Sequence, residues 1–315
     1  MKEQLEALNA ISINFGEGGM KIVNIILAFV MFGVALGIKP RTFKEVFTHP
    51  KSVIVGILSQ WVALPAITFA IALILSPLIT PMIALGMILV ASCPGGNISN
   101  FMTSLSRGNV ELSVSMTAVT TAFAPVITPF NFFFWGSLYS HIISIKSDIP
   151  MLVIPFFPML WQILLLLGVP IVLGLIFSHY FPNATKKITK PAQVISILLF
   201  MGMVVVSFAQ NFQLFLDNIF YVFFIVMIHN ACALGTGYFC GRMGKLPVND
   251  TRSLTIETGI QNSGLGLVLL FNPAIFPPEI WHGQYGGMLF ITAWWGIWHI
   301  ISGLTVSYYF RSKPL

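Results

Sequence analysis

Apolar residues run along the chain in long blocks separated by short polar segments. Most blocks are near the roughly 20 residues that an α-helix needs to cross about 30 Å of hydrocarbon. None alternates between apolar and polar residues as the strands of a membrane β-barrel do. The pattern therefore predicts an all-α polytopic membrane protein with nine transmembrane helices. Their expected ranges are 20–38, 52–76, 81–105, 110–138, 150–178, 192–210, 214–240, 252–271 and 286–309.

The chain is expected to divide into two parts. Residues 1–19 form a polar, extracytoplasmic N-terminal segment, and residues 20–315, whose loops are short, form a single transmembrane domain. The N-terminal segment contains a Gly-Glu-Gly-Gly stretch at 16–19, which predicts a turn. It has no basic start followed by a small-residue cleavage site, so we do not expect a cleaved signal peptide. Short loops without extracellular glycosylation sites are typical of a bacterial inner membrane.

Composition and charge support this picture and add an orientation. Charged residues make up only 8% of the chain and the mean hydropathy is +0.87, whereas soluble domains carry about 25% charged residues. All Lys and Arg except Lys2, Lys21 and Lys146 fall in one set of alternate loops and the C-terminal tail. The positive-inside rule then predicts an external N-terminus and a cytoplasmic C-terminus. The net charge of +6 is spread over these loops, so it implies neither nucleic acid nor a protein partner.

Two of the predicted helices are interrupted near the middle of the membrane. The helix over 81–105 contains Pro-Gly-Gly-Asn at 94–97, and the helix over 252–271 contains Gly259 and Asn-Ser-Gly at 262–264. Two predicted helices precede each interrupted helix and one follows it. The first four and last four helices can therefore be superposed as an inverted repeat, with 150–178 as connector. Paired interruptions of this kind indicate the binding site of a transporter.

Glu257 is the only acidic residue that we place deep in an apolar helix. A carboxylate at that depth costs several kcal/mol unless it is paired, and no Lys or Arg lies at the same depth. A bound cation or a proton would resolve this cost. The alternative is that Glu257, five residues after Arg252, reaches water near the cytoplasmic end of its helix.

Oxygen donors that suit an alkali cation surround the two interruptions. Gln261 lies on the same helical face as Glu257, and a break near Gly259 frees backbone carbonyls. Any one of these polar groups could instead form a hydrogen bond between helices. The candidate ligands are Gln60, Ser99, Asn100, Ser113, Thr117, Glu257, Gln261 and the carbonyls of Thr258 and Ile260.

The second half of each interrupted helix offers free N–H groups and a positive dipole end to an anion. These ends lie near Asn97 and Ile98, and near Asn262 and Ser263. Two Na⁺ ions against the single carboxylate of Glu257 would leave one net positive charge, which favours a monoanionic substrate. His299, inside the last predicted helix, is a further substrate-binding candidate or an interhelical hydrogen-bonding group.

Three motifs resemble the bile acid:sodium symporter family: CPGGNISN at 93–100, RGNVELS at 107–113 and IETGIQNSG at 256–264. The resemblance extends over nearly the whole chain from about residue 20. It implies sodium-driven uptake of bile acids or other organic anions. It also implies a core domain with two crossed, broken helices (52–138 and 214–309) and a panel domain (20–38, 150–178 and 192–210).

The resemblance further implies two sites for Na⁺ as the coupling ion. The first falls on Ser99, Asn100, Ser113, Thr117 and Glu257. The second falls on Gln60, Glu257, Gln261 and the carbonyls of Thr258 and Ile260. Each position carries a residue able to bind Na⁺.

These observations predict a secondary active sodium:organic anion symporter that works by alternating access and is not an enzyme. The substrate would be a bile acid or a small carboxylate, such as a pantoate-like or keto acid. A proton-coupled carrier or exporter of the same fold remains an alternative. An intramembrane enzyme is a remote one, since the chain has no HExxH motif, no paired aspartates and no serine with a plausible base.

Overall fold

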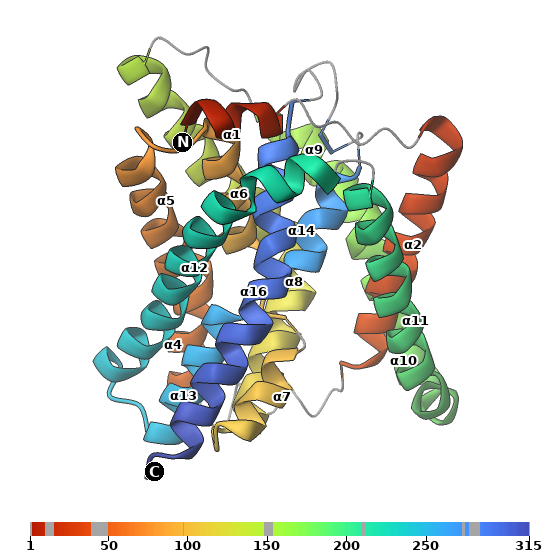
Figure 1. Ribbon diagram of the computed structural model, residues 1–315. Helices are drawn as coiled ribbons and strands as arrows, with labels where there is room; N and C mark the ends of the chain where they lie inside the picture. Colours follow the sequence, from red (N-terminus) through yellow and green to blue (C-terminus); the bar gives the residue numbers. More distant parts are fainter. Residues whose placement is uncertain are drawn as a thin grey trace.

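A computed structural model describes residues 2–9, 16–38, 50–96, 98–147, 154–209, 212–272, 275–276 and 284–314. These residues form helices and turns without a β-strand (Figure 1). The helices are α1 (Lys2–Asn9), α2 (Gly16–Leu36), α4 (Pro50–Leu58), η2 (Ser59–Ala63), α5 (Leu64–Leu75), α6 (Pro81–Ser92), α7 (Ile98–Leu105), α8 (Val110–Ser147), α9 (Phe156–Ile163), η3 (Leu164–Gly168), α10 (Val169–Tyr180), α11 (Pro182–Ala209), α12 (Phe212–Met243), α13 (Val248–Gly259), α14 (Ser263–Leu270) and α16 (Gly286–Arg311).

Five helical segments among the described residues have the length and composition to cross a membrane: Pro50–Leu75, Val110–Lys146, Phe156–Tyr180, Leu216–Met243 and Gly286–Arg311. The shorter apolar helices Asn24–Leu36 and Pro81–Ser92 fall below that length. The all-α membrane architecture is thus confirmed, while the number nine stays a prediction.

The N-terminal segment differs from its prediction. Residues 16–19 belong to α2, so the predicted turn is wrong. Residues 2–9 form α1, whose Leu5 and Leu8 are fully buried against the rest of the protein. Hydropathy averaged over a window misses α1, because the charged residues around these two leucines keep the average low. Two leucines on one face are nevertheless enough for a helix that buries only that face.

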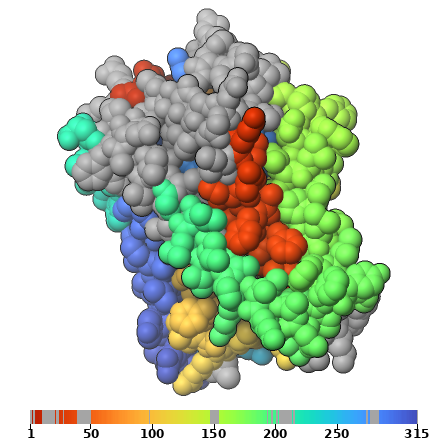
Figure 2. Space-filling view, turned by 90° about the vertical axis from the view of Figure 1, so that its right-hand side faces the viewer, coloured from red at the N-terminus to blue at the C-terminus, as the bar shows by residue number. Residues whose placement is uncertain are grey.

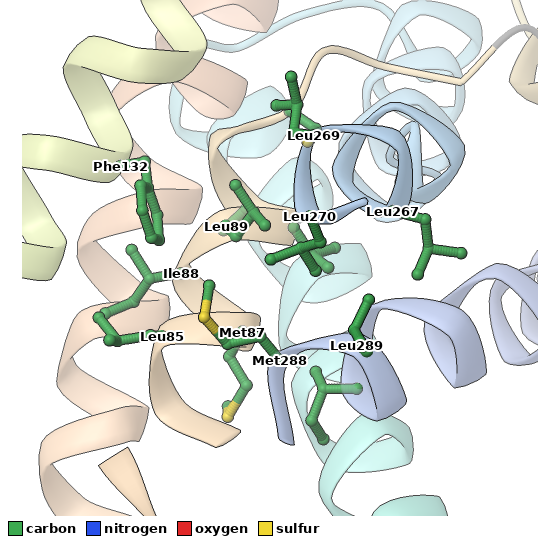
Figure 3. Close-up of a cluster of buried hydrophobic side chains, with 14 of the residues drawn as sticks. Leu85, Met87, Ile88, Leu89, Phe132, Leu267, Leu269, Leu270, Met288 and Leu289 are labelled. Atoms are coloured by element: carbon green, nitrogen blue, oxygen red, sulfur yellow. The ribbon is translucent and has the colours of Figure 1, made fainter. Parts of the chain in front are cut away.

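The apolar core lies where α6, α8, α14 and α16 meet. Figure 3 shows Leu85 and Ile88 of α6 on the side of Phe132 of α8, and Met87 and Leu89 of α6 on the side of Leu270 of α14 and Met288 of α16. At Gly86 the helices approach so closely that a Cβ atom would lie 2.8 Å from the Cα atom of Met288. This packing fixes the positions of α6, which ends at the first interruption, and of α14, which begins after the second.

A second group of helices packs beside this core. Helix α2 contacts α10 and α11, and Figure 2 shows α2 in orange between their green surfaces. A Cβ atom on Gly174 of α10 would lie 2.6 Å from the Cβ atom of Ala35, so this glycine permits the close approach of α10 to α2.

Candidate ion-binding site

The interruptions of the two broken helices are hydrogen-bonded to each other. Helix α6 ends at Ser92, because Pro94 disfavours helical geometry in the residue before it. The Gly96 amide donates to the Ile260 carbonyl (2.7 Å), and the Asn262 amide donates to the Pro94 carbonyl (2.8 Å). Non-helical backbone is tolerated at membrane depth only where protein or water satisfies it. Each interruption therefore stabilises the other.

Glu257 of α13 is fully buried at this junction. It accepts hydrogen bonds from Ser99 of α7 and from two residues of α8, Ser113 (2.8 Å) and Thr117 (2.5 Å). The Ser113 hydroxyl also lies 2.9 Å from the side-chain oxygen of Asn100. The five residues predicted for the first sodium site therefore lie together, although they come from three helices.

The alternative that Glu257 reaches water near Arg252 does not fit this arrangement. Glu257 has no exposed surface. The Arg252 guanidinium instead donates to the backbone carbonyls of Ser106, Lys313 and Pro314. The carboxylate is thus surrounded by hydroxyl donors whose remaining lone pairs are free to contact a cation.

Residues predicted for the second sodium site also lie close to this carboxylate. A Cβ atom on Gly95 would be 2.4 Å from Glu257 Oε1 and 3.5 Å from Gln60 Nε2, so the two side chains lie close together. Within the described part of the chain, both amide atoms of Gln60 and the Oε1 atom of Gln261 are buried without a hydrogen-bond partner. An unpaired buried amide costs about 1–3 kcal/mol. These oxygen atoms therefore fit a cation that they would coordinate.

The predicted carbonyl ligands already accept one hydrogen bond each. The Thr258 carbonyl accepts from Gln261 Nε2 (2.8 Å), and the Ile260 carbonyl accepts from the Gly96 amide. Each carbonyl keeps a second lone pair. The Thr258 hydroxyl is also 3.0 Å from the hydroxyl of Ser59, next to Gln60.

The short π-helix η2 carries Gln60. Pro65, four residues after Trp61, has no N–H to donate to the Trp61 carbonyl. Asn131 of α8 donates to that carbonyl instead (2.9 Å). π-Helical turns occur frequently at functional sites. Sequence reasoning missed Asn131, although the Trp61–Pro65 spacing marks a carbonyl that needs another donor.

A second supporting residue, Asn230 of α12, holds the end of α13. Its Nδ2 atom donates to the Gly259 carbonyl (2.8 Å), and its Oδ1 atom accepts from Ser302 of α16. The neighbouring His229 makes an interhelical hydrogen bond with Thr68 of α5 (2.8 Å).

Four of the five predicted substrate-binding residues lie in the described part of the chain. Asn262 is the N-cap of α14, and its side chain accepts from the Leu265 amide (3.0 Å). Ser263 is buried, and its Oγ atom would be 2.8 Å from a Cβ atom on Gly296 of α16. Ile98 is 37% exposed, His299 is buried in α16, and Asn97 lies outside the described residues.

Comparisons with known proteins identify relatives of this chain. The model of the Sodium Bile acid symporter family matches residues 24–218, more than half of the chain. The chain is 32% identical over 274 residues to an uncharacterized sodium-dependent transporter, YocS, of Bacillus subtilis, covering 85% of this chain and 81% of that protein.

Two further relatives come from plants and animals. A probable chloroplastic sodium/metabolite cotransporter, BASS2, of Oryza sativa is 30% identical, over 80% of this chain and 58% of its own length. The ileal sodium/bile acid cotransporter of Cricetulus griseus is 27% identical, over 78% of this chain and 67% of its own length. The chain therefore spans little more than half of the plant protein.

Proposed function

This chain belongs to the Sodium Bile acid symporter family, and from that premise we propose that it is a sodium:organic anion symporter that works by alternating access. Its relatives are membrane transporters and not enzymes. We further propose that two Na⁺ ions bind on either side of Glu257. The first site consists of Ser99, Asn100, Ser113, Thr117 and Glu257. The second consists of Gln60, Glu257, Gln261 and the carbonyls of Thr258 and Ile260.

The observation that carries this proposal is the environment of Glu257. Glu257 is a fully buried carboxylate, and among the described residues its hydrogen-bond partners are hydroxyl groups and include no cationic side chain to balance its charge. Leaving such a charge unpaired in the membrane costs several kcal/mol. The unpaired amide oxygens of Gln60 and Gln261 are neutral hard ligands, which suit Na⁺.

For the architecture we propose nine transmembrane helices with the N-terminus outside and the C-terminus cytoplasmic, in a bacterial inner membrane. The two interrupted helices would cross within a core domain, and α2, α9, η3, α10 and α11 would form the panel. The hydrogen bonds between the interruptions support the crossing. The contacts of α2 with α10 and α11 support the panel.

For the substrate we propose a monoanion, either a bile acid or a small carboxylate such as a pantoate-like or keto acid. Two Na⁺ and one carboxylate leave one positive charge at the junction, beside the N-termini of α7 and α14, which favour anions. Substrate contacts would come from Asn97, Ile98, Asn262, Ser263 and His299. The names of the relatives, a metabolite cotransporter and a bile acid cotransporter, cover both classes.

The first prediction concerns sodium binding to the purified protein. NaCl is expected to raise the melting temperature above that in KCl at equal ionic strength, because a ligand stabilises the state that binds it. At a concentration about 100-fold above Kd the stabilisation is about 2.7 kcal/mol. Glu257→Gln keeps the shape of the side chain and removes its charge, so it should abolish the difference between Na⁺ and K⁺. The same assay with Na⁺ present can screen organic anions as substrates.

Glu111→Gln is the matched control, because Glu111 is an exposed acid at the start of α8. It should keep the full response to Na⁺. Equal melting temperatures in Na⁺ and K⁺, with a response to pH alone, would overturn sodium coupling in favour of a proton-coupled carrier of the same fold.

A further inference from the structure

A cavity of about 200 Å³ lies away from the ion-binding junction, where the ends of α12 and α16 meet the start of α13. Figure 1 shows these helix ends gathered near the C-terminus. Three basic side chains line the cavity, Arg242, Arg252 and Lys313, and none of its described lining residues is acidic. The cavity therefore offers positive charge that its own wall does not neutralise.

The charge at the back of the cavity is held in a fixed position. Arg252 is only 3% exposed. Its guanidinium donates to the carbonyls of Ser106 (3.0 Å), Lys313 (3.1 Å) and Pro314 (2.7 Å) and lies 5.6 Å from the ring centre of Phe310. These partners are neutral, so they orient the guanidinium without balancing its charge.

The rim of the cavity has the composition of a membrane interface. Tyr238 and Tyr309 line it and are 40% and 58% exposed, and the Lys313 ammonium lies 5.2 Å from the ring centre of Tyr309. Phe239 and Met243, on the same end of α12, are 64% and 82% exposed. Tyrosine and basic side chains concentrate at the level of lipid headgroups, and exposed apolar side chains next to them suit acyl chains.

We propose that this cavity binds the phosphate headgroup of an anionic phospholipid. Basic pockets between transmembrane helices are a recognised form of headgroup site. A soluble phosphate could satisfy the three cations, but it would have no use for the exposed apolar surface of Phe239 and Met243. The lipid would join α12 and α16 to α13, the helix that carries Glu257.

The test compares the protein in nanodiscs of phosphatidylcholine with and without phosphatidylglycerol. We expect phosphatidylglycerol to raise the melting temperature of the wild type, and native mass spectrometry to detect retained phosphatidylglycerol. The double variant Arg242→Gln/Lys313→Gln changes two exposed side chains and should weaken this binding by roughly 30-fold, since each basic residue near the surface contributes about a factor of five.

The double variant Lys245→Gln/Arg311→Gln is the matched control, because it also removes two positive charges, one just after α12 and one at the end of α16, from exposed side chains outside the cavity lining. It should keep the response to phosphatidylglycerol. An equal loss in Lys245→Gln/Arg311→Gln, or no difference between the two lipid compositions, would overturn the site. Equal stabilisation by inorganic phosphate in phosphatidylcholine nanodiscs would overturn the lipid as its ligand.

Discussion

At the scale of single residues, Gly95 sets how closely the first interruption approaches Glu257. A Cβ atom at this position would lie 2.4 Å from Glu257 Oε1, which is below any van der Waals separation. We predict that Gly95→Ala displaces the carboxylate, costs about 1–3 kcal/mol as overpacking and weakens the stabilisation by Na⁺. The melting temperature, titrated with NaCl against KCl, measures both effects.

The adjacent Gly96 provides the control for this prediction. A Cβ atom on Gly96 would be 3.4 Å from the carbonyl oxygens of Ile260 and Gln261, which is close to an ordinary contact. Gly96→Ala should therefore keep most of the sodium response. If the two alanine variants lose the response equally, close approach to Glu257 is not the reason for a glycine at position 95.

At the scale of elements, the π-turn η2 depends on a donor from another helix. Asn131→Ala removes the side-chain hydrogen bond to the partly buried Trp61 carbonyl, which costs about 0.5–1.5 kcal/mol. We predict a lower melting temperature and weaker sodium binding, because Gln60 lies on this turn.

A double-mutant cycle tests the cause. Pro65→Ala restores a backbone N–H four residues after Trp61. This N–H can donate to the Trp61 carbonyl in place of the Asn131 amide. Asn131→Ala should therefore cost less in the Pro65→Ala background than alone. Strictly additive losses in the two backgrounds would show that the amide of Asn131 acts elsewhere.

At the scale of the whole molecule, the proposed transport cycle requires the panel to move against the core. A Cβ atom on Gly168 of η3 would be 3.7 Å from the Cβ atom of Pro125 of α8, a separation that suits a disulfide. We predict that oxidation of the double variant Gly168→Cys/Pro125→Cys stops sodium-driven uptake in liposomes, and that a reductant restores it. The transported anion would be the one that best stabilises the protein with Na⁺.

The two cysteines are introduced into a variant whose native cysteines have been replaced, because these are free thiols that could react with the oxidant: Cys93, Cys232 and Cys240. Each single cysteine variant, treated with the same oxidant, should keep its uptake. Undiminished uptake by the fully cross-linked double variant would show that α8 and η3 do not separate during transport.

The sequence by itself determined the membrane class and most helix positions, because the hydrocarbon requires long apolar helices whatever their packing. It also indicated both interruptions, since proline and glycine act on the local backbone, and it singled out Glu257, whose charge stands alone in an apolar block. Helix ends that extend past the apolar blocks, such as Pro182 of α11, were beyond this reasoning. So was α1, whose two buried leucines form too weak a pattern.

Only the tertiary structure decided which groups meet. The pairing of Gly96 with Ile260, more than 160 residues apart, depends on how α6, α14 and α16 pack. Within the described part of the chain, the same packing leaves the side-chain amide of Gln60 without a hydrogen-bond partner and makes Asn131 a donor to the Trp61 carbonyl. Local periodicity specifies which face of a helix is polar. It does not specify which distant polar face lies opposite, because that depends on the packing of the whole bundle.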